Sequence, residues 1–464
     1  MGAEKLDKKR SGALVGGIFL ILAVPVCGIQ VPVQAFFFLA WIYVILFLEA
    51  NSYSWNELQE AMVHSCTRAV SPIFFLLCAG AMTGIWNLSG TIPGLTYTGI
   101  LWIRPEWYPV TAYAGCFLFS FLTGSVFSSC GTMGILFLNI GTSMGYEEKI
   151  AAAVIIAGAF CGYGISPMSD FVNLLSSSVE IELAKTLKAE RNSIIPTICV
   201  CLAGCFYAGW KNAELAGISI QESSKMIQIF GEMCLGMPVY IPAAVVLIFM
   251  LMRKNAIHAL MAGCVSGMAV AFFYQKYRWQ TILNVLWNGP DQGSYFHSGG
   301  ISSMAGTVLL FLLAFSLFGM LEKSGAIRCM MQPLFKWADT EKKGNIAAIL
   351  FAFVVNVFSA SAMCSLVISV SCLMPVYDEK GCKREKMIHS LFLGALYMSL
   401  LVPWHSNVVT PMGLLGVAQG GACIFWIVPV LEVVCYLLTF VFSGKLVDCL
   451  EKCLICRHIR RFAD

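Results

Sequence analysis

The stretch "GAFCGYGISPMSDFVNLLSSS", residues 158–178, breaks an otherwise apolar segment with glycines, a proline and one acid. Residues 151–160 before the break are apolar, and residues 171–179 after it become largely apolar again. Inside a bilayer, irregular backbone is tolerated only where protein surrounds it or where it lines a water-filled cavity. An acid at membrane depth is costly to keep there and is therefore a candidate functional group. The break at Asp170 predicts a broken helix that carries a polar site in a membrane protein.

The composition of the 464-residue chain also indicates a membrane protein. It is 58% hydrophobic and 12% charged, with a mean hydropathy of +0.77, whereas soluble domains are about 25% charged. About 10 to 12 apolar segments approach the ~20 residues of a bilayer span. We predict an all-α polytopic protein surrounded by lipid, in a cell membrane of the bacterial inner or plasma membrane type. The net charge of +4 is too small to indicate a nucleic-acid partner.

Basic residues near both ends of the chain predict its orientation. Lys and Arg are frequent in "MGAEKLDKKR" (1–10) and in "CLICRHIRR" (453–461), and basic residues beside a span favour the cytoplasmic side. We therefore expect both termini in the cytoplasm, an even number of crossings, and a basic cytoplasmic tail at 447–464. The basic start is expected to flank the first span rather than to begin a cleaved signal peptide.

Three further segments are interrupted in the same way as the opening stretch. They are "FLTGSVFSSCGTMGILFL" (121–138), "VFSASAMCSLVISVSCLM" (357–374) and "YMSLLVPWHSNVVTPMGLLG" (397–416). In each half of the chain, a break rich in Ser or Gly precedes a break that contains proline. Interrupted spans at matching positions of two halves are typical of transporters built from structural repeats, with the site at the bilayer midplane. Small residues also serve ordinary helix packing, but four matched clusters favour a site.

These positions divide a single transporter domain, residues 1–464, into parts. We expect a first repeat at 70–210, connecting helices at 211–300 and a second repeat at 301–446. Both repeats are expected to contain broken helices.

Several motifs resemble those of the NhaC-type Na+/H+ antiporter family, which belongs to the ion-transporter superfamily and includes malate/lactate exchangers. They are "GAMTGIWNLSGTIPGLTYTGI" (80–100), "SSCGTMGI" (128–135), "GISPMSDFVNL" (164–174), "SGGISSM" (298–304) and "LLVPWHSN" (400–407). The resemblance implies two inverted repeats with re-entrant hairpins and an elevator-like motion. At two positions where that family carries further acids, this chain has Tyr163 and Leu393.

The polar residues of the four breaks are the candidates for ion or substrate binding. They are Asp170, Ser166, Ser169, Asn173, Ser129, Thr132, Ser359, Ser361, His405, Ser406 and Asn407. The candidates that shape the hairpins and helix breaks are Gly131, Gly162, Gly164, Pro167, Pro403 and Trp404. Outside the breaks, Arg68 and Arg104 are interpreted either as charges whose long side chains reach the membrane surface or as loop charges, and Glu322 as an interfacial acid.

Asp170 is the acid that predicts the mechanism. Hard cations such as Na+ prefer oxygen ligands, and burial favours protonation of a carboxylate. Alternating occupation of Asp170 by Na+ and by H+ would produce exchange. A helix N-cap is the competing role of Asp170, and one residue can serve both. His405 is either a proton carrier, because an unperturbed imidazole titrates near pH 6.5, or a hydrogen-bonded structural residue.

We therefore predict a secondary active Na+/H+ antiporter. The alternative is a Na+- or H+-coupled exchanger of a small organic carboxylate or an amino acid, which half-helix N-termini could bind. No enzymatic activity is expected, because the sequence lacks paired intramembrane acids and an HExxH motif. No cofactor is expected, and Na+ and H+ are transported ions. The solute, the stoichiometry and the oligomeric state, including a homodimer, stay open.

Overall fold

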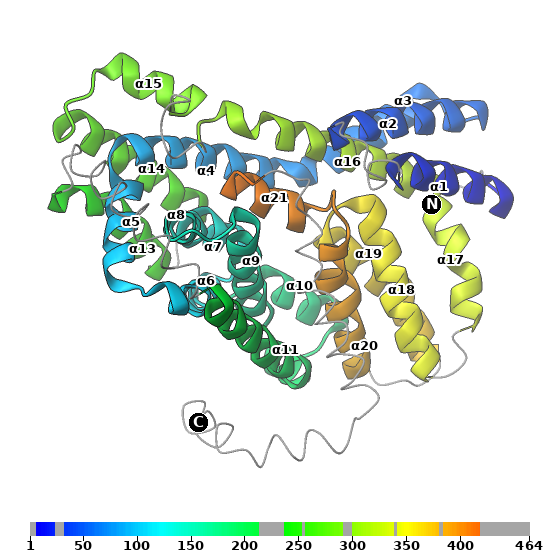
Figure 1. Ribbon diagram of the computed structural model, residues 1–464. Helices are drawn as coiled ribbons and strands as arrows, with labels where there is room; N and C mark the ends of the chain where they lie inside the picture. Colours follow the sequence, from blue (N-terminus) through cyan, green and yellow to red (C-terminus); the bar gives the residue numbers. More distant parts are fainter. Residues whose placement is uncertain are drawn as a thin grey trace, which may run out of the picture.

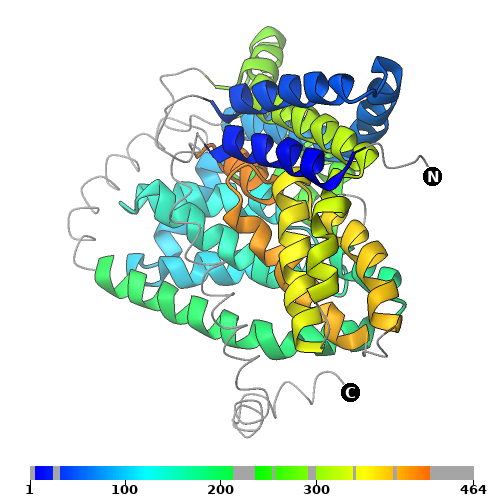
Figure 2. The ribbon, with the colours of Figure 1, turned by 90° about the vertical axis from the view of Figure 1, so that its right-hand side faces the viewer.

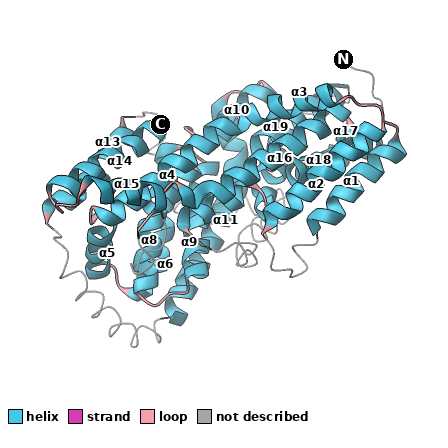
Figure 3. Ribbon diagram, turned by 90° about the horizontal axis from the view of Figure 1, so that it is seen from above, coloured by secondary structure: helices cyan, strands magenta, loops and turns pink. Residues whose placement is uncertain are grey.

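The computed structural model of the chain describes residues 6–23, 32–212, 236–252, 256–290, 299–337, 341–379 and 384–417. Within these ranges every regular element is a helix (Figure 3). The all-α fold class is therefore confirmed. The expected tail at 447–464, the apolar segment near residue 423 and part of the connecting segment lie outside the described residues.

The described helices lie in a first half of the chain, up to Asn212, and in a second half, from Ile241. The helices of the first half are α1 (Lys8–Ala23), α2 (Val33–Ala50), α3 (Trp55–Cys66), α4 (Val70–Leu88), α5 (Thr91–Trp102), α6 (Tyr108–Thr123), α7 (Val126–Ser129), α8 (Ile135–Ser143), α9 (Glu148–Gly164), α10 (Asp170–Val179) and α11 (Leu183–Asn212). Those of the second half are α13 (Ile241–Leu251), α14 (Ala256–Phe273), α15 (Trp279–Asn288), α16 (Ala305–Ser324), α17 (Ala326–Trp337), α18 (Glu341–Ser359), α19 (Ala362–Glu379), α20 (Arg384–Leu391) and α21 (Ser406–Leu415).

Several of these helices are long and apolar enough to cross a membrane. Among the described residues there are six: Val33–Ala50, Trp55–Leu88, Val126–Ser143, Ile194–Lys211, Ala256–Phe273 and Ser302–Ser324. If the pair Met387–Leu401 and Ser406–Leu415, which is bent by 49°, counts as one span, the described residues contain seven. This number is smaller than the number of apolar segments in the sequence. Some of those segments form helices of only 10–17 residues, including the two helices beside the α18–α19 break. The chain is a multi-pass membrane protein.

The helices form two layers that meet at the broken segments. Helices α2, α3, α4 and α16 lie along one side of the molecule, at the top of Figure 1, where α16 packs against α2 and α3. In the other layer α6 packs against α9, and α18 packs against α19, as Figure 2 shows from the side. Helix α21 contacts helices of both layers, because it packs on α4 and α16 and also on α7, α8 and α9.

Each of the four predicted breaks is present. They lie after Thr123, between Gly164 and Asp170, between Ser359 and Ala362, and between Leu401 and Ser406. Gly124 (φ +66°) and Ala360 (φ +49°) adopt the left-handed conformation where α6 and α18 end. Glycine adopts this conformation readily, whereas alanine is strained in it.

Side-chain contacts of the first half recur 236 positions later in the second half. The hydroxyl of Ser129 donates to the carbonyl oxygen of Cys116 (2.9 Å), and the hydroxyl of Ser365 donates to that of Ala352 (2.7 Å). Both members of the second pair lie 236 positions after those of the first. Gly124 and Ala360, at the helix breaks, differ by the same number.

Helix crossings recur with the same spacing. A Cβ atom on Gly158 would collide with the carbonyl oxygen of Tyr113, and one on Gly394 would lie 2.8 Å from that of Ile349. In both halves the missing side chain lets one helix lie directly on the backbone of another. This regular spacing is the property expected of two similar structural units. The bounds of the two repeats stay a prediction.

Candidate functional site

Asp170 lies at the first position of α10, directly after the break that follows α9. The preceding Ser169 is the N-cap, and its side chain accepts a hydrogen bond from the backbone of Val172 (3.3 Å). A serine in this position satisfies one of the free N–H groups of the first helical turn. Ser169 therefore fills the capping role that the sequence left open for Asp170, and the carboxylate is available for other contacts.

The carboxylate of Asp170 is bound on one oxygen and open on the other. Its Oδ1 accepts a hydrogen bond from the hydroxyl of Tyr163 and one from the backbone N–H of Phe171 (3.0 Å). Among the described residues, Oδ2 has no hydrogen-bond donor. The Asp170 side chain is exposed. One oxygen is thus held in place while the other can take a further ligand.

A second open oxygen lies one helical turn further along α10. The side-chain amide of Asn173 donates to the carbonyl oxygens of Pro167 (3.1 Å) and Ser169 (2.7 Å), which directs its oxygen away from the break. Residues 170, 173 and 177 share one face of a helix, and all three are exposed. The opposite face of α10 is apolar and buried, and it includes Phe171, whose ring lies 5.6 Å from that of Phe392. Helix α10 therefore presents a polar face that begins with Asp170.

The break before α10 is joined to the break after α6. The hydroxyl of Ser166 donates to the carbonyl oxygen of Phe121 (2.6 Å) and accepts from the backbone of Met168 (3.1 Å). A Cβ atom on Gly124 would collide with the carbonyl group of Met168. The absence of a side chain at residue 124 therefore allows the two breaks to touch.

His405 has the same structural role in the second half that Ser169 has in the first, 236 positions earlier. It is the N-cap of α21, and its Nδ1 accepts from the backbone N–H of Asn407 (3.0 Å). Its Nε2 lies 3.2 Å from Oδ1 of Asn356. Because Nδ1 accepts a hydrogen bond, the ring is neutral and Nε2 carries the hydrogen that is donated to Asn356. The fully buried imidazole thus has both nitrogens satisfied.

The two breaks of the second half are also bonded to each other. The backbone N–H of Ser406 donates to the carbonyl oxygen of Ala360 (3.0 Å). The indole of Trp404 donates to the carbonyl oxygen of Val357 (2.8 Å), and the side-chain amide of Asn407 donates to the hydroxyl of Ser399 (2.9 Å). These bonds satisfy polar groups that would otherwise be buried without partners.

The candidate residues therefore gather into two groups. The first contains Ser166, Pro167, Ser169, Asp170 and Asn173, and the second contains Ser359, Ser361, Pro403, Trp404, His405, Ser406 and Asn407. Ser129 and Thr132 donate to the backbone carbonyl oxygens of Cys116 and Ser128, and within the described part of the chain neither is hydrogen-bonded to Asp170. The groups interlock through their helices, since α10 packs against α19 and α21 packs against α7.

Three glycines expected at the breaks lie inside helices. Gly162 and Gly164 belong to α9, which continues to Gly164, and Gly131 belongs to the π-helical turn η4 (Cys130–Gly134). A Cβ atom on Gly162 would collide with the carbonyl oxygen of Phe117 on α6. Close helix packing therefore accounts for Gly162, and the break itself begins at Ile165.

Two residues of the site were not predicted as such. Tyr163 contacts Asp170 across the break, and Asn356 binds both the His405 ring and the carbonyl oxygens of Gly394 (2.8 Å) and Ala395 (2.9 Å). Tyr163 was noted in the sequence only as the residue at a position where the family has an acid, so no contact with Asp170 was expected. Asn356 was missed because it lies 49 residues before His405 in the chain. The one signal for Asn356 is an amide at the end of an apolar helix.

Comparison with known proteins places the sequence among antiporters. The Na+/H+ antiporter family matches residues 9–182 and 175–445 of this chain. The Malate-2H(+)/Na(+)-lactate antiporter of Bacillus subtilis (strain 168) is 26% identical over 418 residues, which are 87% of this chain and 88% of that protein. The Na(+)/H(+) antiporter NhaC of Alkalihalophilus pseudofirmus is 26% identical over 361 residues, 75% of this chain and 77% of that protein.

A relative with a different named solute is also similar. The Arginine/ornithine antiporter ArcD of Halobacterium salinarum is 23% identical over 376 residues, 79% of this chain and 77% of that protein. The family match extends over both groups of broken helices. The chain belongs to the Na+/H+ antiporter family.

Proposed function

We propose that this secondary antiporter exchanges Na+ for H+ and that the two ions compete for Asp170. The observation that carries the proposal is the open Oδ2 of Asp170 at the start of a broken helix, with the outward oxygen of Asn173 one turn away. Carboxylate and amide oxygens suit a hard cation. A proton neutralises the same carboxylate, so Na+ and H+ exclude each other.

The fixed surroundings of Asp170 fit such a site. Tyr163 and the N–H of Phe171 hold Oδ1, which leaves one carboxylate oxygen to change its ligand. The N-terminus of α10 carries a partial positive charge, which stabilises the Asp170 carboxylate but weakens the binding of a cation there. A proton carries the same charge as Na+, so this partial charge opposes both ions alike and leaves their competition for Asp170 unchanged.

The test is transport by the purified protein in vesicles. An inward Na+ gradient is expected to drive a change of internal pH with the native chain, and Asp170→Asn is expected to lower the rate about 100-fold, since the variant cannot exchange a proton there. Glu182→Gln, which changes an exposed acid after α10, is the matched control. Undiminished exchange by Asp170→Asn would contradict the role of Asp170.

A carboxylate or an amino acid is the second candidate for the transported solute. It is supported by relatives named as a malate/lactate and an arginine/ornithine antiporter. We also propose a location in the plasma membrane with both termini in the cytoplasm, exchange without a cofactor, and a homodimer as the assembly to test.

The transport cycle is proposed to use the two similar halves. The 236-residue spacing of equivalent contacts supports repeats at 70–210 and 301–446. The layer that contains α9, α10, α20 and α21 would move past the layer of α2, α3 and α16 in an elevator-like cycle. Locking the two layers with a cross-link would then stop exchange without removing Asp170.

A further inference from the structure

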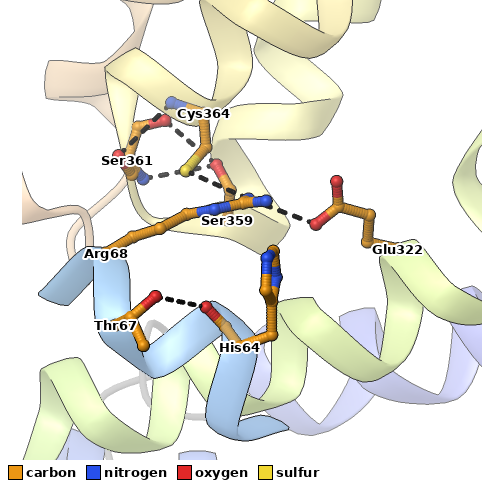
Figure 4. Close-up of polar contacts among 7 residues, drawn as sticks. All are labelled: His64, Thr67, Arg68, Glu322, Ser359, Ser361 and Cys364. Carbon is orange, nitrogen blue, oxygen red and sulfur yellow. Dashed lines mark hydrogen bonds and ion pairs between the residues drawn. The ribbon is translucent and has the colours of Figure 1, made fainter. Parts of the chain in front are cut away.

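A charged cluster lies outside the two groups of candidate residues, where the two layers meet. Arg68 belongs to the short turn (Thr67–Ala69) between α3 and α4, and Nη1 lies 3.1 Å from Oε2 of Glu322 on α16. The same nitrogen lies 3.8 Å from the sulfur of Cys364 on α19. Figure 4 shows Arg68 extending from its helix to the start of α19, with Glu322 on the other side. An arginine of the layer that contains α3, α4 and α16 thus reaches a broken helix of the layer that contains α18 and α19.

The position of Arg68 at one end of an apolar helix, facing other helices, sets it apart from a charge in a loop. It lies in the turn Thr67–Ala69, directly before the apolar helix α4, within the helical stretch Trp55–Leu88. A charged residue that faces other helices of a membrane protein rather than lipid is a candidate for a substrate or ion pathway. His64, one turn earlier on the same helix face, points into the same cluster (Figure 4).

The guanidinium of Arg68 retains unused donors. Its hydrogen bonds to Glu322 and Cys364 both use Nη1. Among the described residues, Nη2 and Nε have no acceptor. The Arg68 side chain is 34% exposed and that of Glu322 is 40% exposed. Nη2 and Nε are the pair of N–H groups that binds a carboxylate through two parallel hydrogen bonds.

The cluster is continuous with the broken helices of the second half. Cys364 lies in the first turn of α19, and its backbone N–H is 3.5 Å from the side chain of Ser361. Ala360 of the same break accepts the hydrogen bond of Ser406 at the start of α21. A carboxylate on Arg68 would therefore lie beside the positive end of α19, which favours an anion.

We propose that Arg68 binds the carboxylate group of a transported organic solute and that Glu322 occupies Arg68 when the solute is absent. This inference rests on the second candidate of the proposed function, in which the transported solute is a carboxylate or an amino acid, and it names the residue that would bind that solute. The Glu322 carboxylate has the chemistry of the ligand, and it is attached to a side chain exposed enough to move away. An ion pair this exposed contributes little to stability, so an incoming carboxylate can replace it.

The test uses the full chain in vesicles with two separate measurements. Uptake of radiolabelled lactate, malate, alanine and arginine is measured against a gradient of the same compound, and Na+-driven pH change is measured in the absence of these compounds. The first two compounds represent organic acids, and the last two represent amino acids. The variants are Arg68→Gln, Arg68→Lys and Glu322→Gln, and Arg104→Gln is the control because Arg104 is an exposed arginine after α5.

The expected result separates binding from folding. Arg68→Gln raises the KM of the transported carboxylate about tenfold or more, because charge-assisted hydrogen bonds are lost. Arg68→Lys restores part of the affinity, since it keeps the charge but not the fork. Glu322→Gln lowers the KM roughly threefold, because an exposed competitor is removed. If the ion pair were purely structural, both Arg68→Gln and Glu322→Gln would lose transport activity.

Three results would overturn the proposal. The first is the same KM in Arg68→Gln and Arg104→Gln, and the second is a KM that rises in Glu322→Gln. The third is the absence of carboxylate uptake by the native chain while Na+-driven pH change persists, which leaves the Na+/H+ exchange intact. Loss of the Na+-driven pH change in the native chain would instead contradict the proposed function. If Arg68→Gln does not fold, the opposite shifts expected for Arg68→Lys and Glu322→Gln decide the question.

Discussion

The hydroxyl of Tyr163 donates a hydrogen bond to Oδ1 of Asp170 across the break between α9 and α10. Seven residues separate the two along the chain, and the break folds them together. The hydroxyl also accepts from the N–H of Phe171 (3.3 Å). Tyr163 therefore orients the carboxylate from the last turn of one helix while the next helix begins.

Removing this hydroxyl is expected to favour the proton in its competition with Na+. A hydrogen bond to a charged group contributes about 1.5–3 kcal/mol, so Tyr163→Phe stabilises the carboxylate less. The KM for Na+ is expected to rise about tenfold at acidic pH and to recover at alkaline pH. Tyr240→Phe, which removes a hydroxyl bonded to Thr98 (2.8 Å), is the control. Equal KM changes at both pH values would contradict this role of Tyr163.

Replacing His405 tests whether it carries a proton. Its Nδ1 accepts from Asn407, so protonation at that nitrogen would place two N–H groups against each other. Asparagine is an equally favourable N-cap, and His405→Asn is expected to retain exchange within about threefold. The free energy of unfolding is expected to fall by about 1–3 kcal/mol, because Asn356 loses a buried partner.

Transport and thermal unfolding of His405→Asn are measured on the same preparation. A folded variant that no longer exchanges Na+ for H+ would identify His405 as a proton carrier. In that case the hydrogen bond to Asn356 would have to open during the cycle.

Helix packing at Gly162 is expected to set the stability of the first half. A Cβ atom there meets the carbonyl oxygen of Phe117, and Gly162→Ala is expected to destabilise the protein by about 1–3 kcal/mol through overpacking. Gly204→Ala is the matched control, since nothing lies within 4 Å of that position. The control is expected to be neutral or to stabilise by up to about 1 kcal/mol, because alanine favours a helix. Equal unfolding temperatures for the two variants would refute the close contact.

The positions of the helix breaks could be predicted from local sequence. Proline removes a backbone donor, and serine caps a helix, so Pro403 and Ser169 mark their breaks wherever the segment lies. The structure has a break at both places. It could equally be predicted that the chain is a membrane protein, because the length and composition of an apolar segment do not depend on its contacts.

Long-range contacts could not be predicted in this way. The pairing of Arg68 with Glu322 joins residues 254 positions apart, and each was interpreted separately as a charge near the membrane surface. Gly162 resembled a break residue, because a glycine that allows a close helix crossing has the same sequence signal as one that ends a helix. The 236-residue spacing became visible only when equivalent contacts could be compared.

Competition between Na+ and H+ for Asp170 is tested most directly by proton release on Na+ binding. Na+ is added to the purified protein in weakly buffered detergent solution, and the pH change is recorded with a dye. If the two ions compete, about one proton is released per bound Na+ in the pH range of exchange, and none is released by Asp170→Asn. Na+ binding without proton release, or an unchanged release in Asp170→Asn, would contradict it.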